Sequence, residues 1–209
     1  MKILAIGAHA DDVELGIGGT LARHVSDGHE VHILIVTHSA YKNFDGKIIR
    51  SKEVALEEAI NAAKIMGVKH LKCLNYETKL VDHGVKLIED INRQIDEIKP
   101  NVIYTHWDGD IHQDHSATAQ ATIVAGRNVP RILMYRSNWY KSYKHFDSNF
   151  YVDITNFIDV KIQAIRAHIS EISRRGDDWV EFFKNQCRNN GQEVGVRYAE
   201  TFQVIKWLA

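Results

Sequence analysis

The 209-residue chain has only two cysteines and two prolines, and its charges almost cancel. Cys73 and Cys187 cannot form a disulfide framework, so the sequence predicts a protein of a reducing compartment, the cytoplasm. The 26 basic and 27 acidic side chains give a formal net charge of −1, which argues against nucleic acid as a partner, because binding to phosphates needs an excess of positive charge. The N-terminus lacks the pattern of a signal peptide, and no apolar run approaches the 18 or so residues of a membrane span, so no membrane association is expected.

Short apolar runs alternate with longer segments of helical period. Strands are expected at residues 3–6, 31–36, 71–74, 102–104, 131–135 and 150–154, and helices at 14–26, 50–66, 85–98 and 116–125. Isoleucines spaced four and three apart predict one long helix from Ile158 to Ile172, and residues 198–207 form a final extended segment. This alternation predicts an α/β fold: a single Rossmann-like domain over residues 1–209, with a mainly parallel sheet covered by helices on both faces.

A first polar cluster follows the first expected strand and contains His9, Asp11, Asp12 and Glu14. Asp11 can cap the following helix, and Glu14 can complete a capping box. Capping leaves His9 and Asp12 unexplained. These two residues are three apart on a tight strand-to-helix turn, where both side chains can converge on a metal ion.

A second cluster follows the fourth expected strand, with three histidines and three aspartates among residues 105–115. Asp114 can cap the next helix, but capping does not explain the other polar residues. His112 and His115 are three residues apart, like the pair in the first cluster. Imidazole and carboxylate together suit zinc or another divalent first-row metal such as Fe²⁺.

The predicted topology joins the two clusters, because ligands of doubly wound sheets bind beyond the carboxyl ends of the strands, where the strand order reverses. His9, Asp12 and one of the two later histidines then supply the three protein ligands of a catalytic metal. Asp11 is left as a general base toward a water molecule, and the other histidine as an acid or electrophile.

Asp114 is expected to orient His112 or His115 from behind. A metal ion, a base and an acid arranged in this way suit the hydrolysis of an amide or an ester.

The two clusters resemble the motifs of a known family, the LmbE-like or PIG-L de-N-acetylases, which are zinc hydrolases of N-acetylated amino sugars. Residues 9–14 are similar to the family's His-Pro-Asp-Asp-x-Glu, with Ala10 in place of proline, and residues 112–115 are similar to its His-x-Asp-His. Arg50 resembles the arginine of an Arg-x-x-Glu motif, which contacts substrate in the family. Glu171 stands where many relatives have glutamine.

The resemblance implies that His9, Asp12 and His115 are the metal ligands, Asp11 the general base and His112 the transition-state stabiliser. It also implies a small-molecule substrate, an N-acylated amino sugar or a conjugate of one, and a homo-oligomer such as a trimer or hexamer.

Other readings of the sequence remain open. Hydrolysis of another amide, such as an N-formyl group, would use the same residues. A non-catalytic sugar-binding relative is a further alternative, but the loss of the base or of a ligand would mark it, and the sequence retains every one of these groups. Residues 16–19, Gly-Ile-Gly-Gly, suggest a nucleotide-binding Rossmann protein, but their spacing is not the dinucleotide fingerprint and nearby acids oppose a pyrophosphate. The aromatic and basic segment 138–150 suits a sugar-stacking wall, an oligomer contact or core packing, and the loop 41–48 suits a lid or a solvated loop.

Overall fold

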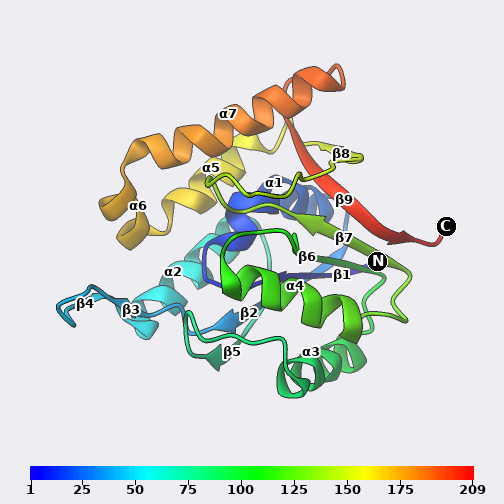
Figure 1. Cartoon of the computed structure of the whole chain (residues 1–209). Coiled ribbons are helices and arrows are strands. Elements are labelled where there is room, and N and C mark those ends of the chain that lie inside the picture. Colours follow the sequence, from blue (N-terminus) through cyan, green and yellow to red (C-terminus); the bar gives the residue numbers. More distant parts are fainter.

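The computed structural model describes all 209 residues, and its centre is a seven-stranded sheet with the order β5-β2-β1-β6-β7-β9-β8 (Figure 1). The strands from β5 to β7 are parallel, whereas β9 runs antiparallel to both β7 and β8. The strands are β1 (Lys2–Gly7), β2 (Glu30–Thr37), β5 (His70–Tyr76), β6 (Val102–His106), β7 (Arg131–Tyr135), β8 (Phe150–Asp153) and β9 (Ala199–Trp207). The predicted α/β class with a mainly parallel sheet is therefore confirmed.

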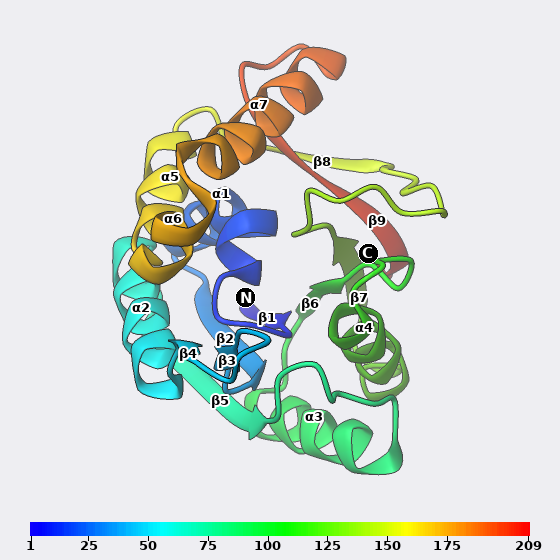
Figure 2. The ribbon, with the colours of Figure 1, turned by 60° about the vertical axis from the view of Figure 1, so that its left-hand side comes forward.

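Helices cover both faces of the sheet, as Figure 2 shows with α1, α2 and α5 on one side and α3 and α4 on the other. Successive side chains of a strand point to opposite faces, so Ile3 and Ala5 of β1 pack toward the first group of helices, and Leu4 and Ile6 toward the second. The helices are α1 (Asp12–Ser26), α2 (Lys52–Ile65), α3 (Val85–Ile98), α4 (Gln113–Ala125), α5 (Ile158–Arg166), α6 (Ile169–Arg175) and α7 (Asp177–Glu193). None of these helices is long and apolar enough to span a bilayer.

Strand β1 lies at the point where the strand order reverses. From β2 the chain continues outward to the edge strand β5, then crosses to β6 on the other side of β1. In the parallel pairing of β1 with β6, Ile3 lies opposite Val102 and Ala5 opposite Tyr104. The loops that follow these two strands are thus neighbours, as the sequence predicted.

Helix α1 is broken at Ile17, whose φ of −142° lies outside the helical range. Both sides of the break are capped by a fully buried ion pair, in which the Lys161 ammonium lies 2.6 Å from the Glu200 carboxylate. Glu200 accepts the backbone N–H groups of Gly19–Thr20, and Lys161 donates to the carbonyls of Glu14–Leu15. This pair fixes the first turn of α1, which carries the acidic cluster.

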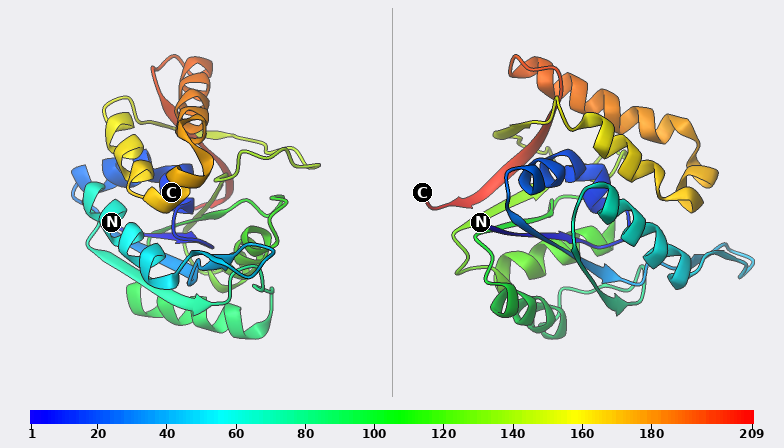
Figure 3. Two further views of the ribbon diagram at one scale, coloured as in Figure 1. Left: turned by 90° about the vertical axis from the view of Figure 1, so that its left-hand side faces the viewer. Right: turned by 180° about the vertical axis from the view of Figure 1, so that it is seen from behind.

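Two local predictions are wrong. The single helix expected from Ile158 to Ile172 is two helices, α5 and α6, because the chain turns out of the helix at His168, where ψ is 68° and the imidazole is buried. The loop expected over residues 41–48 contains the first strand of a short antiparallel hairpin, β3 (Tyr41–Lys42) with β4 (Ile48–Arg50). The hairpin projects from the body of the protein (Figure 3).

Candidate active site

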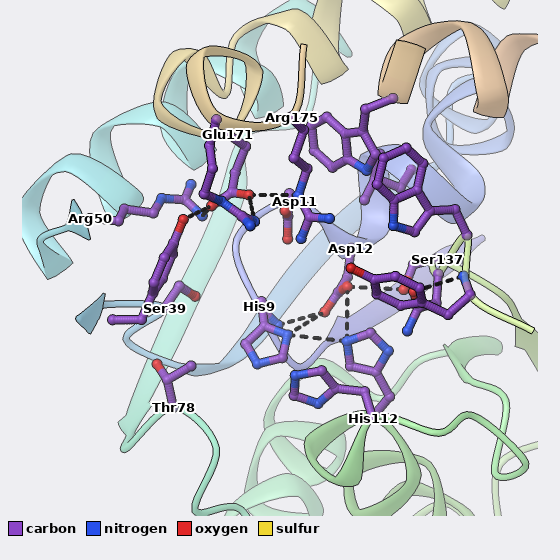
Figure 4. Close-up of a pocket in the computed structure, with 18 of the residues that line it drawn as sticks. His9, Asp11, Asp12, Ser39, Arg50, Thr78, His112, Ser137, Glu171 and Arg175 are labelled. Atoms are coloured by element: carbon purple, nitrogen blue, oxygen red, sulfur yellow. Dashed lines mark hydrogen bonds and ion pairs between the residues drawn. The ribbon is translucent and has the colours of Figure 1, made fainter. Parts of the chain in front are cut away.

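Three side chains form a triangle of lone-pair donors beyond the ends of β1 and β6: His9 from the turn after β1, Asp12 from the start of α1 and His115 from the first turn of α4. Nδ1 of His9 lies 3.1 Å from Nε2 of His115 and 3.3 Å from a carboxylate oxygen of Asp12. The third side, from Nε2 of His115 to the other oxygen of Asp12, measures 3.2 Å. Figure 4 shows His9 and Asp12 turned toward each other at the floor of a pocket.

This triangle has the size that a metal ion requires. Ligand atoms about 2.0–2.1 Å from a tetrahedral zinc ion are roughly 3.3 Å apart, close to all three measured sides. Two imidazoles and one carboxylate also form a common ligand set for catalytic zinc. The residues present therefore fit a divalent first-row metal.

The charges around the triangle favour a cation at its centre. Burial by itself lowers the pKa of His9, but hydrogen bonds to Asp114 and Asp12 outweigh burial and raise this pKa to about 9. For His115, burial is likewise outweighed by Asp12 and Asp110, and its pKa rises to about 10. The carboxylates thus favour positive charge at this point, which a divalent cation supplies.

The imidazoles of His9 and His115 each contact an aspartate through the ring nitrogen that faces away from the triangle. Asp110 lies 3.1 Å from Nδ1 of His115, which leaves Nε2 facing the triangle. Asp114 lies 2.9 Å from Nε2 of His9 and accepts the backbone N–H groups of Lys79 and Val81. The structure therefore brings the Asp114 carboxylate against His9 rather than against His112 or His115. Carboxylates in these positions fix the orientation and tautomer of metal-binding histidines.

His106, Ser137 and Asp110 were not singled out from the sequence. Nε2 of His106 lies 3.1 Å from Asp12 and accepts the backbone N–H of Ala8 at 2.9 Å, so its lone pair is already engaged. Ser137 donates to the other oxygen of Asp12 at 2.9 Å. The clustered histidines drew attention to residues 105–115, which include His106. Their spacing alone does not distinguish a metal ligand from a residue that only contacts a ligand.

Asp11 occupies the N-cap position of α1, yet its side chain makes no capping hydrogen bond. Its carboxylate is only 8% exposed, lines the pocket and has no hydrogen-bond partner in the protein. Burial and the neighbouring charges of Asp12 and Glu171 raise its pKa. The side chain is thus a free carboxylate with increased proton affinity, which is what a general base needs.

His112 caps α4 and offers one ring nitrogen to the pocket. Its Nδ1 accepts the backbone N–H of Asp114 at 3.2 Å, so the neutral ring carries its proton on Nε2. Burial and the nearby charges of His115 and His9 lower the pKa of His112 to about 4. A neutral imidazole with Nε2–H available is suited to donate a hydrogen bond to a developing oxyanion.

Arg50, expected to contact substrate, lines the pocket but is only 3% exposed. Its Nη2 donates to the carbonyl of Ala10 at 3.1 Å and to Glu58 at 2.8 Å, and Nη1 lies 3.8 Å from Glu171. Arg50 is therefore not a surface arginine, although it does pair with a nearby acid, Glu58. Arg50 holds the backbone of the turn that carries the acidic cluster, and substrate contact stays a prediction.

The outer walls of the pocket are aromatic and basic. The pocket has a volume of about 290 Å³, and Trp139, Tyr140 and Trp179 contribute rings to it. The Arg175 guanidinium lies over the rings of Trp139 and Trp179, while Tyr41 of the hairpin donates to Glu171 at 2.7 Å. Two aromatic residues of segment 138–150 thus line the pocket, in the place expected of a sugar-stacking wall.

Comparison with known proteins gives the family. Residues 4–125 match the model of the PIG-L family, described as GlcNAc-PI de-N-acetylase. The chain is 35% identical over 177 residues to the uncharacterized deacetylase YaiS of Escherichia coli K12, a match that covers 80% of this chain and 90% of YaiS. The chain belongs to the PIG-L family.

Two further similarities span nearly the whole chain. The diacetylchitobiose deacetylase of Thermococcus kodakarensis is 24% identical over 229 residues, which cover 98% of this chain and 83% of that protein. The crystal structure of GalB, the 4-carboxy-2-hydroxymuconate hydratase of Pseudomonas putida KT2440, superposes with a TM-score of 0.80 at 17% identity and covers 98% of this chain and 95% of GalB. One fold thus carries different reactions, and the site residues must decide which one.

Proposed function

We propose that this protein is a metal-dependent N-deacetylase that hydrolyses the N-acyl group of an amino sugar or its conjugate. The observation that carries the proposal is the unbonded carboxylate of Asp11 beside the donor triangle of His9, Asp12 and His115. The proposed reaction uses both parts: a metal site, and a carboxylate that is free to accept a proton from water. Zinc is the metal that suits these donors best, with Fe²⁺ as the alternative.

A bound divalent cation supplies an acidified water, with a pKa near 7, and polarises the acyl carbonyl. With a divalent cation held by His9, Asp12 and His115, Asp11 would accept a proton from the water molecule that attacks the carbonyl carbon. Nε2–H of His112 donates a hydrogen bond to the carbonyl oxygen as negative charge develops there. Asp11 then returns its proton to the sugar nitrogen, so that the C–N bond breaks and a carboxylic acid and an amine leave.

The aromatic wall supports a sugar as the substrate. Faces of sugar rings are lined by C–H groups and pack against aromatic rings such as Trp139, Tyr140 and Trp179, which lie at the pocket. The GlcNAc-PI de-N-acetylase description of the family and the diacetylchitobiose deacetylase relative support the same class. Both names describe N-acetylated amino sugars attached to a second group.

A substrate panel tests the proposal. Purified protein loaded with zinc is incubated with N-acetylglucosamine free, as a glycoside and linked to a nucleotide, and with the N-formyl analogues. Released acetate is the expected product, and Asp11→Asn is the matched control that should release almost none. Release of formate alone would assign another amidase activity, and sugar binding without hydrolysis would assign a non-catalytic relative.

We also propose that the protein assembles into a homo-oligomer. The side chain of Phe44, at the tip of the β3–β4 hairpin, is fully exposed and Ile48 is largely exposed, which supports a trimer or hexamer assembled through this hairpin. Light scattering should give a multiple of the 23.9 kDa chain mass, and Phe44→Asp should reduce the measured mass.

Cys73 and Cys187 are both free thiols, which supports a reducing cytoplasmic location.

A further inference from the structure

A second group of metal-binding side chains lies at the opposite end of the sheet, where β2 and β5 begin. Glu30 and His32 are two residues apart on β2, so their side chains share one face of the sheet. His70 of β5 is the register partner of His32 in the parallel pairing. One ligand atom from each of the three residues lies within 4.8 Å of the others.

The three side chains are arranged as a tridentate site. The imidazole rings of His32 and His70 stack with centroids 4.5 Å apart and planes 15° from parallel, while a carboxylate oxygen of Glu30 lies 2.7 Å from Nε2 of His32. Two histidines and one glutamate are a recognised zinc ligand set. The fixed register of the two neighbouring strands places the backbones of His32 and His70 side by side, so that only side-chain rotation is needed to bring both imidazoles to one ion.

The surroundings leave room for a cation and favour its charge. The group opens into a surface hollow of about 470 Å³, whose far side is formed by Gln94 and Glu97 in the last turns of α3. The C-terminal end of a helix carries partial negative charge, which attracts cations. Water molecules in the hollow can complete the coordination of an ion held by three side chains.

Three lysines, Lys2, Lys69 and Lys72, line the same hollow, and two of them pair with its carboxylates, but only weakly. Lys2 lies 3.8 Å from Glu30, and Lys72 lies 3.4 Å from Glu97, and all four side chains are about half exposed. Ion pairs at such exposure contribute little free energy, and the lysine ammonium is carried on a flexible stem. A divalent ion bound by two imidazoles and a carboxylate can therefore displace Lys2 from Glu30.

We propose that Glu30, His32 and His70 form a second divalent-metal site, with a ligand set suited to zinc, that links the edge strand β5 to β2. The site is separate from the donor triangle, because it lies at the amino ends of parallel strands and the triangle at their carboxyl ends. Zinc bound there stabilises the folded chain by mass action and leaves catalysis unchanged.

Zinc stoichiometry tests this site directly. The full-length protein is stripped with a chelator and titrated with ZnCl₂ by calorimetry, and the bound zinc is also counted after equilibrium dialysis at micromolar free zinc. Wild type should bind two zinc ions per chain, and His70→Ala one. His145→Ala, a matched control at an exposed histidine without hydrogen-bond partners, should still bind two.

The readout is the difference of one zinc ion between wild type and His70→Ala, so it does not depend on whether the donor triangle binds metal. Micromolar zinc should also raise the melting temperature of His115→Ala, which keeps the second site, more than that of the His70→Ala/His115→Ala double variant. Circular dichroism checks that the variants fold. Equal stoichiometry in wild type, His32→Ala and His70→Ala would overturn the proposal.

Discussion

The carboxylates of Asp11 and Asp12 are neighbours in the chain but lie in different environments. Asp12 lies within 3.3 Å of ring nitrogens of His9, His106 and His115. Burial raises its pKa, but His115 and His106 outweigh burial and hold this pKa well below the usual range. Asp11 contacts none of these rings and has a raised pKa from burial and from negative neighbours. One residue is thus built to stay ionised, and the other to take up a proton.

Because the two carboxylates differ in this way, replacing each with asparagine should impair activity for a different reason. Asp11→Asn should retain zinc, because the three donors remain, and should lose about 10²–10⁴-fold in kcat, the usual effect of removing a general base. Asp12→Asn should instead lose metal affinity, and excess zinc should restore part of its activity. Metal content and kcat are measured over a range of zinc concentrations. Near-normal turnover of Asp11→Asn, or its full rescue by zinc, would show that Asp11 is not the base.

His106 is predicted to strengthen metal binding without being a metal ligand itself. His106→Ala removes the acceptor of the Ala8 amide and a neighbour of Asp12, while it leaves all three donors in place. Residues that support metal ligands typically contribute about 10–100-fold to metal affinity or activity, so a loss of that size is expected. His115→Ala is the comparison and should lose the metal outright. A His106→Ala protein as metal-poor as His115→Ala would make His106 a ligand.

The substitution Arg50→Lys tests whether Arg50 binds the substrate or only holds the backbone turn that carries the acidic cluster. Arg50→Lys keeps the charge but loses the planar fork, which here reaches both the Ala10 carbonyl and Glu58. If Arg50 acts through the turn alone, kcat falls and KM stays constant. If it also contacts substrate, as the resemblance implies, KM rises as well. Kinetics with the best substrate of the panel separate the two, and no change in either constant would exclude both roles.

The sequence predicted those parts of the protein that rest on local patterns. The buried runs Ile3–Ile6 and Val102–Tyr104 identified two central strands, and right after each came the cluster of ionisable residues that the fold brings together. That the loops after these two strands lie together followed from the general topology of doubly wound sheets, whereas the full strand order was not predicted. The spacing alone did not show which of His112 and His115 is the metal ligand and which is the acid or electrophile.

What the sequence missed depends on contacts between distant segments. The turn at His168 interrupts a regular isoleucine pattern because its imidazole is buried 3.2 Å from Arg50, 118 residues earlier in the chain. The partner of Asp114 is His9, 105 residues away, although neighbours in the sequence looked equally suitable. Lys161 and Glu200 look like surface charges, and only the break in α1 explains why they are buried.

The last prediction concerns pH and a site far from the pocket. His24 of α1 is held between Tyr104 and His29, at 3.0 Å from each. Burial, followed by the charge of His29, lowers its pKa from 6.5 to about 4. Between pH 7 and pH 5 the unfolded chain therefore gains a proton at His24 that the folded chain does not, and the fold loses stability as the pH falls.

The loss amounts to about 2 kcal/mol in the free energy of unfolding over this interval, at 1.36 kcal/mol per pKa unit. His24→Gln keeps a polar side chain that does not titrate, so its stability relative to wild type should improve by about that amount from pH 7 to pH 5. Urea unfolding at the two pH values measures it, with His145→Gln as the exposed control. Titrating groups that do not contact His24 cancel in the comparison, because they are common to both proteins, and His29→Gln as a second background removes the contribution of its neighbour His29. An equal pH dependence of wild type and His24→Gln would mean that His24 is protonated in the folded protein at pH 5, and hence that its surroundings do not exclude the charge.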